Sequence, residues 1–151
     1  MRYNWFAELV GSRESGVGSR CLTAHHADDN IETLLMNFCR GTGLYGLGGM
    51  PGISPYSHVC RPLLNFWKEQ LIEFAKQNKL EFVEDSSNQL SKYTRNLFRN
   101  EIIPLMIKAY PQVKENLNDN IKRFKDIRQL YDISVKDLKK KRSLSRKQRG
   151  S

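Results

Sequence analysis

The sequence predicts an α/β domain with a mostly parallel sheet, followed by a long helical extension. Apolar runs at residues 20–24 and 59–64 have the length of buried strands, and residues 81–85 are predicted to form a further short strand. Amphipathic helical patterns separate these runs, and strands that alternate with helices are typical of parallel sheets. From Tyr93 onward the apolar residues recur at helical spacing only, so we expect no further strand after that point.

The N-terminal part of the chain supplies the first strand and the first complete helix. Residues 2–9 match the end of a helix, residues 11–19 a polar loop, and residues 20–24 a strand. A helix is predicted over residues 28–40. Its expected buried stripe recurs at i, i+3, i+4 and i+7 and consists of Ile31, Leu34, Leu35 and Phe38.

The ends of this helix carry their own signals. Asp28 can cap the free N–H groups of the first turn, and Gly41 ends the helix. Residues 41–52 then contain six glycines, which implies unusual backbone angles or close approach of the backbone to a ligand. The segment is not a P-loop, because no Lys-Ser/Thr follows it. A ligand-embracing loop and a plain connector both remain open.

A second strand–helix unit follows. Residues 59–64 form a short strand or an extended entry to a helix, since Arg61-Pro62 interrupts the run. Asn65 can cap the next helix and Asn78 can end it. The stripe of that helix consists of Leu64, Trp67, Leu71 and Phe74. Residues 81–85 form a third strand that leads into a polar turn at residues 86–88.

The rest of the chain is predicted to be helical. Phe98, Ile102, Leu105 and Met106 form a stripe, and Pro104 breaks or restarts the helix. After Pro111 a stripe runs from Val113 to Leu138, which corresponds to a helix of about 39 Å. Such a helix must pack on the body, on a further domain or on another chain, so a homodimer is one option.

The charge is concentrated at the C-terminus. The chain carries +9 overall, and residues 136–149 alone carry +7, with eight basic residues against Asp137. We expect the last residues to be solvated and disordered, and to bind polyanions in a salt-dependent manner. The predicted organisation is a partial α/β domain at 1–110, an amphipathic linker helix at 111–140 and a basic tail at 141–151.

From the composition we expect a cytoplasmic protein that has no membrane span. No segment reaches the ~20 apolar residues of a membrane span, and the N-terminus lacks the apolar core of a signal peptide. Cys21, Cys39 and Cys60 are scattered and odd in number, as expected of reduced and mostly buried thiols.

The candidate site lies where the first strand meets its helix, which is where open α/β sheets bind ligands. His25, His26, Asp28, Asp29 and Glu32 fall within eight positions there. Such carboxylates can orient an amine, hold a metal or accept a proton. The alternative is a capped helix end with solvated acids. A zinc site is disfavoured, because adjacent side chains on a strand point to opposite faces.

Six motifs in order resemble those of the tRNA(Ile)-lysidine synthases, of the PP-loop ATP-pyrophosphatase superfamily. The resemblance covers about residues 2–130. The motifs are Arg2-Tyr3-x-Trp5-Phe6, His25-His26-x-Asp28-Asp29-x-x-Glu32-Thr33, Arg40-Gly41-x-Gly43-x-x-Gly46-Leu47, Arg61-Pro62-Leu63-Leu64, Glu84-Asp85-Ser86-Ser87-Asn88 and Tyr93-x-Arg95-Asn96-x-x-Arg99-x-x-Ile102-Ile103-Pro104.

The resemblance implies a fold and an activity. The fold would be the C-terminal half of a Rossmann-like, PP-loop-type parallel-sheet domain. The activity would be ATP-dependent ligation of free lysine to C2 of the wobble cytidine of tRNA(Ile), with ATP and Mg²⁺ as cofactors. The catalytic residues implied are Asp28, Asp29, Glu32 and Arg95. Substrate or nucleotide contacts are implied for His25, His26, Gly41, Gly43 and Arg99, and no resident metal ligand is implied.

One departure from the family pattern limits these expectations. The phosphate loop Ser-Gly-Gly-x-Asp-Ser does not occur in the sequence. We therefore expect an internal piece of the enzyme that is inactive alone. Two alternatives are a tRNA 2-thiolation enzyme of the same superfamily, disfavoured by the lack of paired cysteines, and a non-catalytic RNA-binding module.

Overall fold

The computed structural model describes residues 20–54, 58–82 and 93–148. The part described is mostly helical and has a two-stranded sheet. Along the chain its elements are β1 (Cys21–Leu22), α2 (Ala27–Cys39), α3 (Gly43–Leu47), β2 (Val59–Cys60), α4 (Lys68–Gln77), α5 (Tyr93–Leu97), the π-helix η2 (Phe98–Ile102), α6 (Ile103–Ala109) and α7 (Val113–Gln148).

The two strands pair in parallel, as the sequence predicts. Cys21 lies beside Val59 and Leu22 beside Cys60. Both strands are shorter than the apolar runs that predicted them. β2 ends before Arg61-Pro62, where the proline has no N–H to donate to a ladder.

The hydrophobic core joins α2 to α7. Ile31, Leu34 and Ile121 are buried together, and partly buried hydrophobic residues pack around them: Leu35, Leu47, Trp67, Ile103, Leu117 and Phe124. The prediction that Phe38 belongs to the buried stripe is wrong, because Phe38 is 68% exposed. Phe38 lies in the last turn of α2, where none of the described elements covers it.

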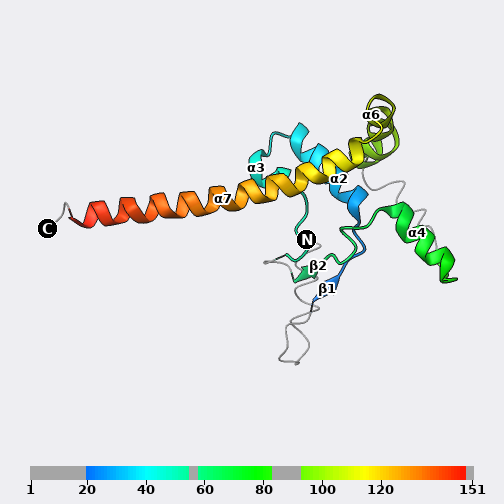
Figure 1. Cartoon of the computed structure of the whole chain (residues 1–151), viewed down its shortest axis with the longest axis horizontal. Coiled ribbons are helices and arrows are strands. Elements are labelled where there is room, and N and C mark those ends of the chain that lie inside the picture. The colour runs from blue at the N-terminus through cyan, green and yellow to red at the C-terminus, as the bar shows by residue number, and fades with distance from the viewer. Residues whose placement is uncertain (1–19, 55–57, 83–92, 149–151) are drawn as a thin grey trace.

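Helix α4 corrects two predictions. It begins at Lys68 and its cap residue is Trp67, whose N–H donates to Gln70 Oε1 at 2.9 Å, so Asn65 is not the cap. Its apolar face is not buried, since Phe74 is 59% exposed and no residue of α4 is buried. Figure 1 shows why: α4 stands away from the α2–α7 contact.

The third predicted strand is not found at residues 81 and 82, which adopt no regular structure. The remainder of that strand and the turn at 86–88 lie outside the described residues. The same holds for the predicted helix end at 2–9 and the loop at 11–19.

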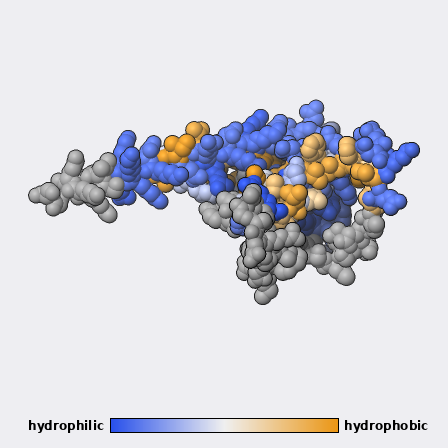
Figure 2. Space-filling model, turned by 90° about the horizontal axis from the view of Figure 1, so that it is seen from below, coloured by the Kyte–Doolittle hydropathy of each residue, from blue (hydrophilic) through white to orange (hydrophobic). Residues whose placement is uncertain are grey.

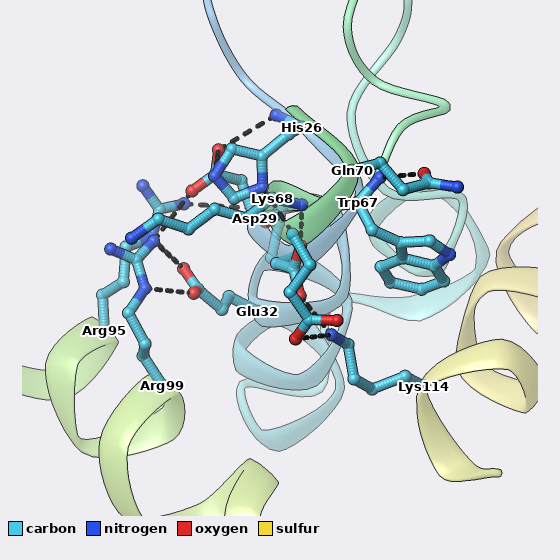
Figure 3. Close-up of polar contacts among 12 residues, drawn as sticks. His26, Asp29, Glu32, Trp67, Lys68, Gln70, Arg95, Arg99 and Lys114 are labelled. Atoms are coloured by element: carbon cyan, nitrogen blue, oxygen red, sulfur yellow. Dashed lines mark hydrogen bonds and ion pairs between the residues drawn. The ribbon is translucent and has the colours of Figure 1, made fainter. Parts of the chain in front are cut away.

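The region around Pro104 shows how the sequence reshapes a helix. Pro104 lies in the first turn of α6, directly after the π-helix η2. A proline donates no N–H, and its ring crowds the carbonyl group four residues back. The π-helix η2 ends two residues before this proline. It also places Arg99 one turn before α6, on the side that faces α2 (Figure 3).

Helix α7 is longer than predicted. It has 36 residues, about 54 Å, and its C-terminal part extends beyond the body (Figure 1). Residues 141–148 are helical, which corrects the prediction of a disordered tail for this stretch. The reason is local: Lys, Arg, Leu and Gln favour helix, and residues 113–149 contain no glycine or proline.

The surface of α7 is largely hydrophilic (Figure 2). Exposed apolar side chains nevertheless occur along it, among them Ile127, Leu130, Ile133 and Leu138. Of the helices that the structure describes, none is both long and apolar enough to cross a membrane. Cys21 and Cys60 are partly buried, but Cys39 is exposed, so the expectation of mostly buried thiols holds only in part.

Candidate functional site: a buried carboxylate–guanidinium cluster

Two acidic residues of α2 are buried, although the sequence places them beside the apolar stripe. Glu32 is 1% exposed and Asp29 is 9% exposed. A solvated helix end would leave both carboxylates in water. The alternative interpretation of this motif, a capped helix end with solvated acids, is therefore wrong.

Arg99 of η2 is the main partner of both acids. Its Nε donates to Glu32 Oε1 at 2.6 Å, and its Nη2 donates to Glu32 Oε2 at 3.0 Å. The same Nη2 also donates to Asp29 Oδ1 at 2.8 Å. A planar guanidinium that holds both oxygens of one carboxylate is the strongest common form of ion pair. Figure 3 shows Arg99 reaching α2 from the neighbouring helix.

Arg95 approaches the same carboxylate from one turn earlier. Its Nη2 donates to Thr33 Oγ1 at 3.1 Å, and its Nε lies 3.4 Å from Glu32 Oε2. That Nε is buried and makes no hydrogen bond. Arg95 and Arg99, which are four residues apart, thus approach the same carboxylate of Glu32.

The first turn of α2 is capped in a way that the sequence did not reveal. The cap residue is His26, and the Asp29 carboxylate accepts its backbone N–H at 3.1 Å. The imidazole lies between two acids, with Nδ1 3.4 Å from Asp28 and Nε2 3.4 Å from Asp29. Asp28 is therefore not the cap of its own helix.

Asp28 instead ties α2 to two other helices. Its Oδ2 accepts the backbone N–H of Lys68, the first residue of α4, at 2.9 Å. Its Oδ1 lies 2.7 Å from Lys114 Nζ of α7, and that ammonium also lies 4.7 Å from the centre of the Trp67 ring. Asp28 thus serves as an N-terminal acceptor for α4.

Burial and charge shift the pKa values of these groups in opposite directions. Burial raises the pKa of Glu32 above its usual value, and contact with Arg99 only partly offsets this. Burial also acts to raise the pKa of Asp28, but contacts with His26, Lys114 and the Lys68 N–H outweigh it and lower that pKa well below the usual range. The hydrogen bond to Glu32 raises the pKa of Arg99 further.

The cluster is electrically balanced. Three carboxylates (Asp28, Asp29 and Glu32) face three cations (Arg95, Arg99 and Lys114). Among the residues described, no group of His, Cys, Asp and Glu side chains is arranged to hold a metal ion.

The structure leaves three of the expected site residues away from this cluster. His25 Nδ1 lies 2.9 Å from Thr23 Oγ1, on the strand side of the junction. Gly41 and Gly43 have φ values of +66° and +68° and lie beyond the C-terminal end of α2. That end, at Cys39, is about 15 Å along the helix axis from Asp29. Their predicted contacts with substrate or nucleotide remain predictions.

Sequence reasoning missed two members of the site. Lys114 follows the cluster by more than eighty residues, and nothing in its surroundings in the sequence marks it as a partner of Asp28. Thr33 stands inside the acidic motif, and its hydroxyl group is the acceptor for Arg95. The Thr that directly follows Glu32 was the only available signal for this contact.

Comparison with known proteins agrees with these observations. The family model of the PP-loop domain matches residues 1–106. The PP-loop domain is an ATP-binding domain, so the match implies ATP as the ligand of the family.

Three similar curated proteins share one name. A tRNA(Ile)-lysidine synthase of Bacteroides thetaiotaomicron is 36% identical over 140 residues, which are 92% of this chain and 32% of that protein. Its counterpart in Porphyromonas gingivalis W83 is 34% identical over 137 residues, or 91% of the chain and 29% of that protein. The tRNA(Ile)-lysidine synthase of Hydrogenovibrio crunogenus is 45% identical over 100 residues, which are 62% of this chain and 24% of that protein.

The chain thus spans about a third or less of the length of these relatives. The six motifs, the acid cluster at the strand–helix junction and the match over residues 1–106 agree with one another. The chain belongs to the PP-loop domain family.

Proposed function

We propose that this chain supplies the lysine-handling part of a tRNA(Ile)-lysidine synthase, within the C-terminal half of a Rossmann-like domain. The observation that carries the proposal is the buried Glu32 carboxylate, which Arg99 holds through both oxygens beside Asp29. The names of the relatives support the same assignment. The substrates would be tRNA(Ile), free lysine and ATP.

The reaction has two steps. ATP adenylates the oxygen on C2 of the wobble cytidine, and pyrophosphate leaves. The ε-amine of lysine then attacks C2, a C–N bond forms, the bond from C2 to the adenylated oxygen breaks, and AMP departs with that oxygen. The amine must lose a proton before or during the attack, so a carboxylate nearby is required.

Asp29 is the best candidate for that carboxylate. It is less buried than Glu32, and its Oδ2 lies next to His26 at the entrance of α2. A group held in this position can bind the lysine ammonium and then accept its proton. His26, within 3.4 Å, is placed to share the proton.

Glu32 is better described as a positioning residue. It is 1% exposed, and its two oxygens are occupied by Arg99 and approached by Arg95. Its role would be to hold the two guanidinium groups in place. Those cations would stabilise negative charge that develops on the cytidine and on the departing phosphate.

The charge balance of the cluster has a consequence for lysine binding. An incoming ammonium adds a fourth cation, and Asp29 already bonds Arg99. We expect lysine to compete with the Arg99 Nη2 contact, while the contacts of Arg99 to Glu32 persist. Lysine binding would then free an Arg99 N–H for the nucleotide.

ATP and Mg²⁺ would depend on different groups for binding. The chain lacks the Ser-Gly-Gly-x-Asp-Ser loop, whose backbone N–H groups cradle phosphates in the family. Mg²⁺ would arrive with the phosphates of ATP, since the described carboxylates pair with cations instead.

Two further features belong to the proposal. Gly41 and Gly43 are proposed to contact the nucleotide, and a homodimer through α7 is proposed as the assembly.

The test is ATP-dependent incorporation of labelled lysine into tRNA(Ile). It is performed with the 151-residue chain and with the chain joined to an upstream PP-loop segment that contains Ser-Gly-Gly-x-Asp-Ser. We expect incorporation with the extended protein and little with the chain alone. An extended, folded protein that binds tRNA but incorporates no lysine would contradict the proposal and favour a non-catalytic RNA-binding module.

A further inference from the structure

A groove outside the acid cluster runs between the glycine-rich loop and α7. It has a volume of about 550 Å³, and one wall is formed by Gly48, Gly49, Pro51 and Gly52. The other wall is a face of α7. Figure 1 shows α3, which leads into the loop, lying alongside α7.

Asn30 and Arg61 hold the loop wall in place by hydrogen bonds. Asn30 Oδ1 accepts the backbone N–H of Met50 at 2.7 Å, and Asn30 is 3% exposed. Arg61 donates from its backbone N–H to the Gly52 carbonyl at 2.7 Å and from Nη1 to the Pro51 carbonyl at 2.9 Å. The loop is therefore held at both ends, and a ligand would meet a preformed backbone surface.

The helix wall is cationic. Lys125, Arg128 and Lys136 line it, and Asp132 is the one acid among the lining residues that the structure describes. Asp132 is already engaged, since it accepts the Tyr45 hydroxyl and lies 3.8 Å from Arg128 Nε. The surplus of positive charge in this groove thus has no counter-ion among the lining residues.

The cations are held at the groove in different ways. The Arg128 guanidinium stacks over the Tyr45 ring, with 4.6 Å between Cζ and the ring centre. The Lys125 stem lies against Gly48, where an added Cβ would be 3.4 Å from its Cγ. Partial desolvation lowers the pKa of Lys125. Neither Lys125 nor Lys136 has an ion-pair partner within the described part of the chain.

The arrangement of the cations indicates the shape of the ligand. Positions 125, 128 and 136 follow one another along a single helix face and span about 16 Å at 1.5 Å per residue. Phosphates of one nucleotide would need donors that converge on a point, as in a P-loop. A row of this length instead matches successive phosphates of a nucleic-acid strand. The side-chain-free glycine wall lets a sugar–phosphate backbone approach closely.

We infer that this groove binds a stretch of the tRNA backbone through Lys125, Arg128 and Lys136, against the glycine wall of residues 48–52. The inference rests on the proposed function for the identity of the RNA. Its role is to position the substrate by sequence-independent phosphate contacts, while base recognition occurs elsewhere.

The test uses binding of a tRNA(Ile) transcript to the full 151-residue chain at several salt concentrations, followed by fluorescence anisotropy. One variant carries Lys125→Gln, Arg128→Gln and Lys136→Gln. A matched control removes the same number of charges from exposed positions of α7 that do not line the groove: Lys122→Gln, Lys139→Gln and Lys141→Gln. Circular dichroism checks that both remain folded.

We expect the groove variant to lose about tenfold or more in affinity and to lower the slope of log K against log salt by about 2, since each phosphate contact contributes about 0.7–0.9. The control should change affinity by less than about threefold. Equal losses in the two variants would overturn the inference, because they would show only general attraction to a basic helix.

Two further arms separate the remaining cases. The double variant Lys125→Gln, Lys136→Gln keeps the Arg128–Tyr45 stack, and we expect a smaller loss in the same direction if the triple variant does not fold. Weakened binding of ATP or tripolyphosphate, with tRNA binding unchanged, would overturn the RNA assignment. A chain that binds no tRNA at all would contradict both this inference and the proposed function. If lysine is incorporated but the groove substitutions leave tRNA affinity unchanged, this inference alone is contradicted.

Discussion

Arg99 Nε donates to Glu32 Oε1 at 2.6 Å and so joins the π-helix η2 to α2 across 67 positions of the sequence. The contact lies between a buried carboxylate and a side chain that is 38% exposed. The pair is therefore solvated from the arginine side only. Arg99 thus links η2 to the acid cluster, and Arg95 of the preceding α5 approaches the same carboxylate.

Glu32→Gln is expected to reduce the free energy of unfolding. The substitution keeps the size of the side chain but leaves two guanidinium groups without their shared anion. Removing one partner of a buried pair typically costs about 3–5 kcal/mol, and the exposure of Arg99 places this site at or below the lower end. Urea denaturation measures the effect. Glu69→Gln is the control, because the Glu69 side chain is 87% exposed and its loss should cost less than about 0.5 kcal/mol.

Asp29→Asn should lower the rate of lysine incorporation while the cap of α2 is kept. The amide can still accept the backbone N–H of His26, but it cannot hold an ammonium or take up its proton. Single-turnover lysine incorporation by the extended protein should fall by ~10²–10⁴-fold. Asp119→Asn, on an exposed turn of α7, serves as the control and should leave the rate unchanged. A near-normal rate for Asp29→Asn would remove Asp29 from the catalytic role.

The pKa of Asp28 predicts a specific loss of stability in acid. In the folded chain its pKa is below the usual value of 3.8, so the unfolded chain binds the proton more readily. The stabilising contribution is present above that usual value and is lost as the pH falls through and below it.

Comparing Asp28→Asn with the unsubstituted chain at about pH 6 and about pH 3 tests this by urea denaturation. At the higher pH the variant should be less stable, because Lys114 and the Lys68 N–H lose an anionic acceptor. Between the two values it should lose less stability than the unsubstituted chain. An identical acid sensitivity in both proteins would show that these contacts do not stabilise the fold.

Local signals in the sequence predicted the elements well but not their surroundings. The helical stripe at Ile31 and Leu34 and the parallel pairing of the two strands are confirmed. Phe38 and Phe74 follow the same periodicity and yet are exposed, since spacing reveals one face of a helix and not whether another element covers it.

The same limit applied to the site. Arg95 and Arg99 were proposed as site residues because their motif resembles one of the lysidine synthases. The burial of Glu32 could not be read from a helical wheel, because it arises from packing of η2 against α2, far apart in the sequence. The role of Asp28 as acceptor for α4 and Lys114 likewise depends on tertiary contacts.

Substitution of three glycines by alanine should give a graded loss of stability. Gly52 has an ordinary φ and open space at the Cβ position, so Gly52→Ala should change the free energy of unfolding by less than about 0.5 kcal/mol. Gly41 has a φ of +66° with open space, so Gly41→Ala should cost about 1–2 kcal/mol through backbone strain alone. Gly49 has a φ of +64°, and its added Cβ would lie 2.3 Å from Asn30 Oδ1.

Gly49→Ala must therefore either displace Asn30 or move the loop, and both outcomes break the hydrogen bond from Met50 to Asn30. Its loss should exceed that of Gly41→Ala by about 1–3 kcal/mol, the cost of a buried polar group left unsatisfied. Urea denaturation of the three variants measures the order. If Gly49→Ala cost no more than Gly41→Ala, the loop would not be held by Asn30, and the preformed glycine wall of the RNA groove would lose its support.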